Sequence, residues 1–375
     1  LGMVACNNEE VPNVVDGAQS TISIKVLPTS NGPSTLATGD LNGASTSAIA
    51  IAESAIKKLE VYLFFGDKVE GYGSADNANE VIKIATKTGP KTIVVVANGS
   101  IGQVADKSAL LAKTKDLPVT IDNGLTMTGE SAEIIVAPGQ NYYGYSDAQL
   151  TGKEPGVKHS VGAPLKITRV NARVAIVDAK LDATLTPGQE AIFNGLTNIE
   201  VAIFNVPKTT KLFGSSLATN ANYIYGGEAW PSSLGSYVVG TVEATFKDSP
   251  VTLPIANTAA PYYYVNENTA ANKKEQMLIV LRGKPTLDGA EVKAEGLYTD
   301  KDGYTYYPVW VNAADYDYAE GYVADSKVLR NTQYNISLLI KGIGNPTIDP
   351  VQDAFLDVIV EVEPWKVVNQ NVTWN

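Results

Sequence analysis

Hydrophobic and polar residues alternate along many short segments of the chain, and a period of two predicts β-strands. The clearest segment runs from Leu356 to Val362, where Leu or Val occupies every second position and Asp357 and Glu361 lie between them. Other segments show the same alternation or a continuous run of β-branched residues. We predict strands at Thr21–Leu27, Leu59–Phe65, Val81–Ala85, Ile93–Ala97, Ile134–Ala137, Leu165–Val177, Ile199–Ile203, Val238–Phe246, Met277–Leu281, Thr305–Val311 and Ile336–Ile340.

Helical periodicity is confined to one stretch, Ile101 to Lys115, in which three apolar side chains fall roughly on one face. Turn residues separate the predicted strands, and Asp302-Gly303 ahead of Tyr304 is typical of a β-hairpin turn. Short strands with turns between them and almost no helix predict an all-β fold. We therefore expect two tandem β-sandwich domains, with one short helix in the first.

Two stretches with few apolar residues suggest where the domains begin and end. Residues 7–20 are mostly polar, so 1–20 is interpreted as a lipoprotein signal remnant followed by a tether. Tyr142 to Gly162 is rich in Gly, Ser and Lys and is interpreted as a loop. These stretches place an N-terminal β-sandwich domain at 21–162 and a C-terminal one at 163–375.

Composition narrows the classes of function. The length of 375 residues suits two domains. The net charge of −11 argues against nucleic-acid binding, which requires a basic surface. The single Cys6 excludes an internal disulfide, and the single His159 excludes a multi-histidine metal site. The sequence contains no phosphate-binding glycine loop and no nucleophile elbow. We predict neither enzymatic activity nor a cofactor.

The first residues, Leu1 to Cys6, place the small Ala5 directly before the cysteine and polar residues after it. This order is typical of the end of a bacterial lipoprotein signal peptide, so we expect Cys6 to carry the lipid. The rest of the sequence has no stretch of the roughly eighteen apolar residues that a membrane span needs. The protein is therefore expected to be anchored by lipid.

Two segments near the ends of the chain are unusual. The predicted strand Thr21 to Leu27 is followed by Pro28 to Ser47, a run of Ser, Thr, Gly, Asn and Pro. Loops of this length inside a compact domain are usually functional or disordered. At the other end, Trp365 to Trp374 resumes the apolar pattern after Pro364, which interrupts a strand because it has no N–H. The C-terminal strand either completes its own sheet or pairs with another molecule.

Three further groups of residues permit chemistry but also have a structural explanation. Clustered tyrosines on a β-sandwich can bind sugars, although tyrosine also favours half-buried strand faces. Asp300 and Asp302 form part of a calcium loop but lack its other ligands, which favours a hairpin turn. Asp315, Asp317 and Glu320 would suit glycoside hydrolysis only at a separation that sequence does not show. The clusters are Tyr142, Tyr143 and Tyr145; Tyr262 to Tyr264; Tyr304, Tyr306 and Tyr307; and Tyr316, Tyr318 and Tyr322.

Several stretches together resemble the major fimbrial subunits (fimbrilins) of Bacteroidales bacteria. No single stretch is diagnostic, but they follow the family's order over nearly the whole chain. They are Asn141–Ser146, Pro164–Arg173, Leu212–Gly214, Asn220–Tyr223, Tyr306–Asn312, Arg330–Tyr334 and the ending Trp365–Trp374.

The resemblance implies two transthyretin-like β-sandwich domains and export as an outer-membrane lipoprotein precursor that becomes part of an extracellular fimbrium. It implies a structural shaft subunit that polymerises by protease-triggered donor-strand exchange and supports adhesion. The partners would be copies of the chain itself in a head-to-tail filament, anchor and tip pilins, a maturation protease, and host or bacterial surface ligands.

In that scheme a protease removes the first strand, and the C-terminal segment of a neighbouring subunit fills the apolar groove left behind. Ile22, Ile24 and Val26 would occupy the groove before maturation. The family's processing cut follows an arginine, whereas this chain has no Arg before Arg169, so neither the protease nor the cut position follows from the resemblance. The expected donor residues are Val358, Val360, Val362, Trp365, Val367, Val372 and Trp374.

An alternative function stays open from the sequence. A cell-surface lipoprotein made of β-sandwich modules would bind glycans through the tyrosine clusters. A glycan-array or pull-down signal from the monomeric protein that is abolished by Tyr→Ala changes in one cluster would favour this alternative.

Overall fold

The structure is a computed structural model, and contacts group the chain into two compact units. Unit 1 comprises Leu1–Leu27, Ile56–Leu111 and Thr128–Ile167, and unit 2 comprises Pro28–Ala55, Ala112–Met127 and Thr168–Asn375. The structure describes residues 17–28, 52–118, 121–185, 187–214, 223–226, 252–256, 260–314, 316–318, 322–348 and 356–364.

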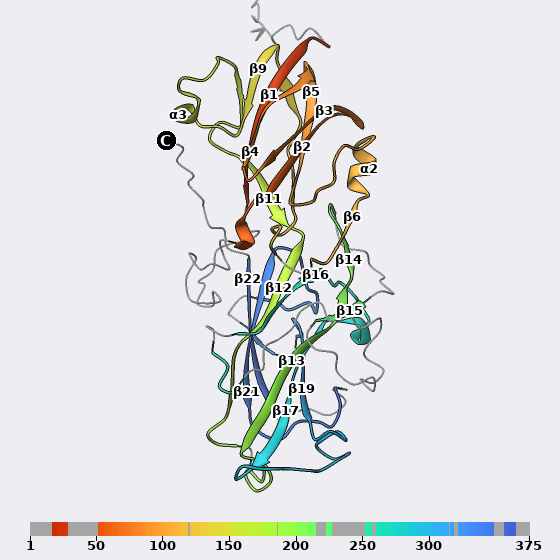
Figure 1. Ribbon diagram of the computed structural model, residues 1–375, viewed down its shortest axis with the longest axis vertical. Helices are drawn as coiled ribbons and strands as arrows, with labels where there is room; N and C mark the ends of the chain where they lie inside the picture. The colour runs from red at the N-terminus through yellow and green to blue at the C-terminus, as the bar shows by residue number, and fades with distance from the viewer. Residues whose placement is uncertain are drawn as a thin grey trace, which may run out of the picture. The chain divides into compact units, whose positions relative to one another are not determined.

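Unit 1 is built from strands that are hydrogen-bonded in the order β10-β9-β1-β11-β7-β5-β2-β3, with β4 paired to β1 and β8 to β5. Figure 1 labels β1 to β5, β9 and β11 of this sheet. The apolar alternation of the sequence produces its core, because the inward residues of β1 and β2 and nearly all of β5 are buried. The strands are β1 (Gln19–Pro28), β2 (Lys58–Phe65), β3 (Lys68–Asp76), β4 (Glu80–Lys87), β5 (Gly89–Ala97), β7 (Met127–Glu130), β8 (Ile134–Val136), β9 (Gly139–Tyr143), β10 (Val157–His159) and β11 (Leu165–Arg169).

Among its described residues, unit 2 contains two five-stranded sheets and a two-stranded one. Sheet F has the order β16-β12-β21-β22-β20, and sheet G has the order β15-β13-β17-β18 with β19 paired to β17. The strands of sheet F are β12 (Asn171–Leu181), β16 (Tyr262–Asn266), β20 (Asp317–Tyr318), β21 (Thr332–Ile340) and β22 (Leu356–Pro364). Those of sheet G are β13 (Gly195–Pro207), β15 (Tyr223–Gly226), β17 (Leu278–Leu287), β18 (Ala290–Glu291) and β19 (Thr305–Trp310), and β6 (Thr114–Asp116) pairs with β14 (Thr209–Lys211).

The core of unit 2 lies between sheets F and G. One buried cluster joins Val174 and Ile336 of sheet F to Val201 and Ile279 of sheet G. Two sheets that bury their facing apolar sides against each other form a β-sandwich. The predicted all-β fold is therefore confirmed.

The predicted helix is shorter than expected. Only α2 (Lys107–Leu111) is helical, because Asp106 Oδ1 accepts a hydrogen bond from Ala109 N and starts the helix there. The amides of Ile101 and Gly102 instead donate to the buried Glu60 carboxylate, which holds this part of the stretch outside the helix. A further single-turn helix, α3 (Asp147–Leu150), lies in the same unit.

The stretch Tyr142 to Gly162, predicted as a loop, contains regular structure. It includes the end of β9, helix α3 and strand β10, and β9 pairs in parallel with both β1 and β10. The predicted strand Leu165 to Val177 is divided at Val170 into β11 and β12. The predicted strand Val238 to Phe246 lies outside the described residues.

Candidate functional site

Strand β1 lies inside the sheet of unit 1, and its apolar residues are part of the core. It pairs antiparallel with β4, where Ile24 lies opposite Val81, and in parallel with β9, where Ile24 lies opposite Tyr143. Ile22, Ile24 and Val26 are each 0% exposed. We call the space that β1 fills between β4 and β9 the β1 site.

Polar side chains also hold β1 in place. Ser20 Oγ lies 2.7 Å from the carbonyl oxygen of Ala137 and 2.6 Å from that of Gly139. Asn141 Nδ2 donates to Ser20 Oγ over 3.0 Å and to the carbonyl oxygen of Thr21 over 3.2 Å. Because buried polar groups need partners, any strand that replaced β1 would have to supply new ones.

The only histidine of the chain supports this network. His159 of β10 places Nε2 3.1 Å from Oδ1 of Asn141, which is itself fully buried. Burial lowers the pKa of the His159 imidazole below its ordinary value, because it disfavours the charged form. His159 therefore has a structural position next to the strand that borders β1.

The C-terminal strand β22 completes sheet F of its own unit. It pairs antiparallel with β21 along its whole length, with Val362 opposite Tyr334, and in parallel with β20. Val358 and Val360 are 7% and 0% exposed and belong to the core, whereas Ile359 is 51% exposed on the opposite face. The alternative in which the strand completes its own sheet is thus realised for β22, and its predicted donor role stays a prediction.

Several predicted sites fall outside the described residues. The lipid-attachment residue Cys6 and the segment 29–51 are among them. The donor residues beyond β22 are also outside, and they are Trp365, Val367, Val372 and Trp374.

Three of the four tyrosine clusters are mostly buried, and the rings of the fourth, Tyr316, Tyr318 and Tyr322, are half-buried. Tyr145, Tyr263 and Tyr307 are 2%, 0% and 0% exposed. The hydroxyl of Tyr263 donates to the carbonyl oxygen of Val201 over 2.7 Å, and that of Tyr307 to the carbonyl oxygen of Gly342 over 3.0 Å. Burial raises the pKa of the Tyr307 hydroxyl. These rings pack and hydrogen-bond within the units, which favours the structural interpretation.

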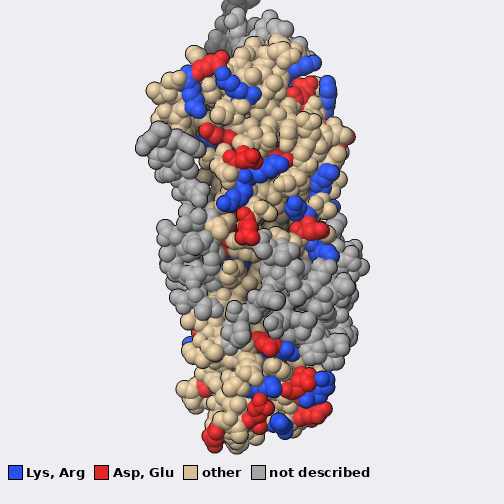
Figure 2. Space-filling model, viewed as in Figure 1, with Lys and Arg blue, Asp and Glu red and all other residues tan. Residues whose placement is uncertain are grey.

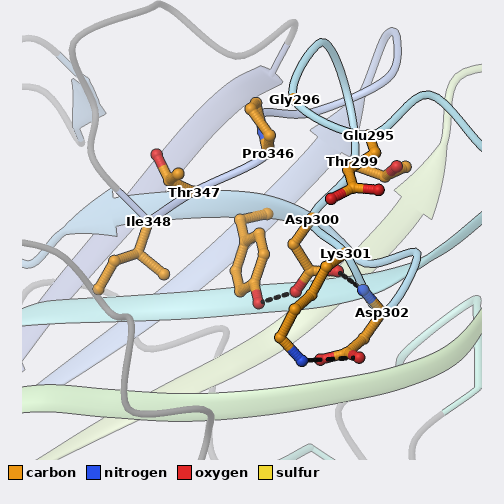
Figure 3. Close-up of a pocket in the computed structure, with 10 residues that line it drawn as sticks. Glu295, Gly296, Thr299, Asp300, Lys301, Asp302, Pro346, Thr347 and Ile348 are labelled. Atoms are coloured by element: carbon orange, nitrogen blue, oxygen red, sulfur yellow. Dashed lines mark hydrogen bonds and ion pairs between the residues drawn. The ribbon is translucent and has the colours of Figure 1, made fainter.

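The pair Asp300 and Asp302 forms the predicted turn and borders a pocket of about 350 Å³ (Figure 3). Asp300 Oδ1 accepts hydrogen bonds from the backbone amides of Asp302 and Tyr304, and Oδ2 accepts one from the Tyr306 hydroxyl over 2.7 Å. Lys301 Nζ pairs with Asp302 over 2.8 Å. The Asp300 carboxylate therefore stabilises the turn. The strands on either side of it, β18 and β19, each pair with β17, so the turn does not close the predicted hairpin.

The other predicted carboxylates are only partly described by the structure. Asp315 and Glu320 lie outside the described residues, and Asp317 begins β20. Within the described ranges, no three His, Cys, Asp or Glu side chains converge as a metal site requires, and no helix could cross a membrane. Figure 2 shows acidic and basic side chains interspersed on the visible face of each unit.

A buried ionic cluster in unit 2 was not predicted. Arg169 and Arg173 are 0% and 2% exposed, and both contact Glu53, which follows the segment 29–51 in the sequence. The pKa of Arg169 is lowered to about 10, chiefly because burial disfavours the charged guanidinium; the carboxylate of Glu53 opposes this shift, and the positive charge of Arg173 contributes to it. The alternation of Arg169 and Arg173 with Val170 and Ala172 was the available sequence signal, since it placed both arginines on one face.

Comparison with known proteins identifies the class to which this two-unit all-β chain belongs. A family model described as the major fimbrial subunit protein (FimA) matches residues 20–169, and one described as the FimA4 pilin C-terminal domain matches 171–365. The fold and these matches define a fimbrial subunit. The chain belongs to the family of FimA major fimbrial subunits.

Individual relatives agree with this assignment. The chain is 32% identical to a major fimbrium subunit FimA type-2 of Porphyromonas gingivalis, over 100% of this chain and 97% of that protein. It is 31% identical to the type-3 subunit of the same species, with the same coverage. The crystal structure of a fimbrilin from P. gingivalis W83 matches with a TM-score of 0.74 and 28% identity over 94% of this chain and 99% of that one. A structure from Parabacteroides distasonis, at 20% identity and a TM-score of 0.67, shares the fold.

Proposed function

We propose that this chain is a shaft subunit that polymerises by protease-triggered donor-strand exchange and supports surface adhesion. The observation that supports the proposal is the position of β1, an inner strand whose residues Ile22, Ile24 and Val26 are fully buried and which a long segment, 29–51, joins to the rest of the chain. Proteolysis within 29–51 would separate β1 covalently from everything that follows it.

Removal of β1 would leave a site in unit 1 that can bind another strand. The backbone amides and carbonyls of β4 and β9 would lose their hydrogen-bond partners, and the apolar space that Ile22, Ile24 and Val26 fill would become empty. An added strand satisfies both needs, and each buried apolar side chain contributes roughly 1.5–3 kcal/mol. The resulting filament contact would be very stable.

The C-terminal part of another copy is the proposed donor. Residues 365–375 contain two tryptophans and three valines, and β22 directly precedes them. Donation by Val358, Val360 and Val362 as well would require β22 to leave sheet F of its own unit. Head-to-tail contacts of this kind, when they do not close a ring, produce a filament.

Delivery, processing and partners complete the proposal. The extracellular fimbrial location follows from the family, and the outer-membrane lipoprotein precursor, lipidated on Cys6, rests on the sequence order around this residue. Anchor and tip pilins, a maturation protease, and host or bacterial surface ligands would be the other partners. The proposed role needs neither a cofactor nor catalysis by this chain.

A variant with an inducible cut tests strand exchange. The chain contains no arginine before Arg169, and Arg169 is fully buried, so Thr38→Arg creates a single early site for an arginine-specific protease. After digestion we expect filaments by electron microscopy and a ladder on unboiled gels. The same variant truncated after Pro364 retains β22 and should be cut but stay monomeric.

Wild-type protein treated with the same protease is the matched control and should stay uncut before Arg169 and remain monomeric. Thermal unfolding should show that the truncated chain is folded. Polymerisation of the truncated chain after cutting, or none by the full one, would contradict donation by residues 365–375.

A further inference from the structure

The helical residues 52–54 are fixed to unit 2 by a buried carboxylate. Glu53 is 2% exposed, and its Oε1 lies 2.6 Å from Nη1 of Arg173, which is also buried. The same oxygen accepts a hydrogen bond of 2.9 Å from the hydroxyl of Tyr264. A buried charge is stabilised only by such partners, so the contacts specify where Glu53 must lie.

A second arginine holds the backbone of the same segment. Arg169 Nε donates to the carbonyl oxygen of Glu53 over 2.9 Å, and Arg169 Nη2 donates to Ser54 Oγ over 3.0 Å. The segment is therefore held through its side chains and its main chain at once. Charge-assisted hydrogen bonds of this kind are stronger than neutral ones.

The segment lies on the outer face of sheet F. Arg173 of β12 is in register with Tyr264 of β16 and with Gln333 of β21, so these three side chains share one face of the sheet. Arg173 Nη2 donates to Gln333 Oε1 over 2.7 Å. The neighbouring residue Val174 points into the core between sheets F and G, which places Glu53 on the side away from that core.

The chain passes from unit 1 to unit 2 at the segment 52–55 and then returns to unit 1. β1 belongs to unit 1, the segment 52–55 to unit 2, and β2 to unit 1 again. We propose that Glu53 and its two arginines act as a clamp that sets where the retained chain begins. Processing between 29 and 51 would release β1, while Ala52 and the residues after it stay bound to unit 2.

The clamp also limits where a protease can act, because cleavage requires a locally unfolded segment. It separates a removable part of the chain from a retained part, and it does so through contacts that survive the loss of β1. This inference rests on the proposed processing. The resistance of residues 52–55 to proteolysis can nevertheless be measured on the monomer.

Exhaustive trimming of the cut Thr38→Arg variant tests the clamp. An aminopeptidase added after the arginine-specific cut would shorten the new N-terminus, and intact mass spectrometry would show where trimming stops. We expect it to stop at or before Ala52. In the same background, Glu53→Ala should let trimming pass Ser54 at least about tenfold faster, because the loss of one partner of a buried ion pair is strongly destabilising.

Two further variants make the result decisive. Glu291→Gln changes an exposed glutamate of β18 in the same unit and should trim as the parent does. Glu53→Gln preserves the volume of the side chain without its charge and replaces Glu53→Ala if that variant fails to fold. Trimming of the parent beyond Ser54, or equal trimming of the parent and the folded Glu53 variant, would overturn the clamp.

The outcome is separable from that of the proposed function. Trimming that stops at Ala52 in protein that never polymerises would support the clamp and contradict strand exchange. Filaments formed by a chain that is trimmed past Ser54 would support strand exchange and contradict the clamp.

Discussion

Replacing Ile24 by alanine is expected to lower the free energy of unfolding of unit 1 by about 3 kcal/mol, since buried Ile→Ala changes leave a cavity. Ile24 is fully buried on the inner strand β1, between β4 and β9. Trp310, the tryptophan among the described residues, lies in unit 2, so its fluorescence reports on unit 2. Hydrogen exchange of β4 and β9 amides, read by mass spectrometry, measures the effect in unit 1.

Ile82→Ala is the matched control for this prediction. Ile82 lies on β4, the direct neighbour of β1, but its side chain is 57% exposed. Its replacement should change the free energy by no more than about 0.5 kcal/mol. Similar exchange rates in the two variants would mean that the apolar face of β1 does not stabilise unit 1.

Placing a charge at Val360 is expected to destabilise unit 2 by about 4 kcal/mol or more, because the core offers a carboxylate no water. Val360 of β22 is 0% exposed and lies opposite Ile336 of β21 in the core of the sandwich. Denaturant unfolding of Val360→Asp, followed by tryptophan fluorescence, measures the loss. The result reports how firmly β22 is held by its own unit.

The neighbouring residue provides the control. Ile359 is 51% exposed, so Ile359→Asp introduces the same charge into the same strand on the face in contact with solvent. It should unfold close to the wild-type midpoint. Equal destabilisation by the two changes would contradict the orientation of β22, and no effect of Val360→Asp would show that β22 is not part of the folded unit.

The strands with clear apolar alternation were predictable, and those without it were not. β1 and β2 follow the predicted segments closely because their buried side chains alternate or run continuously. β3 has no such pattern. Its Gly73 faces β4 so closely that a Cβ atom would lie 2.8 Å from side-chain atoms of Val81 and Ile84, and a missing side chain leaves no hydrophobic signal.

The ionic cluster shows why polar residues are harder to place. The alternation around β12 correctly separates Arg173 from the core residue Val174, and that pattern alone would leave the arginine exposed to solvent. Arg173 is buried because Glu53, which is 120 positions away in the sequence, covers it. Local periodicity carries no information about such a distant partner.

For β1 and β22, the sequence pattern predicted the strands but not their places in the sheets. The sequence patterns of β1 and β22 were sufficient to predict strands, but they did not show that β1 is an inner strand or that β22 pairs with β21. Those facts depend on strand order, which period-two alternation does not encode. The roles of β1 as the removed strand and of the C-terminal segment as the donor stay predictions.

The most direct test of the central claim is the mass of the subunit within assembled filaments. Filaments would be purified, dissociated by prolonged heating and measured by intact-mass and N-terminal analysis. The account predicts subunits that have lost Gln19–Pro28, begin between residues 29 and 52 and retain the C-terminal residues 365–375. Filaments whose subunits still contain Gln19–Pro28 would show that assembly leaves the β1 site occupied by its own strand, and would contradict strand exchange.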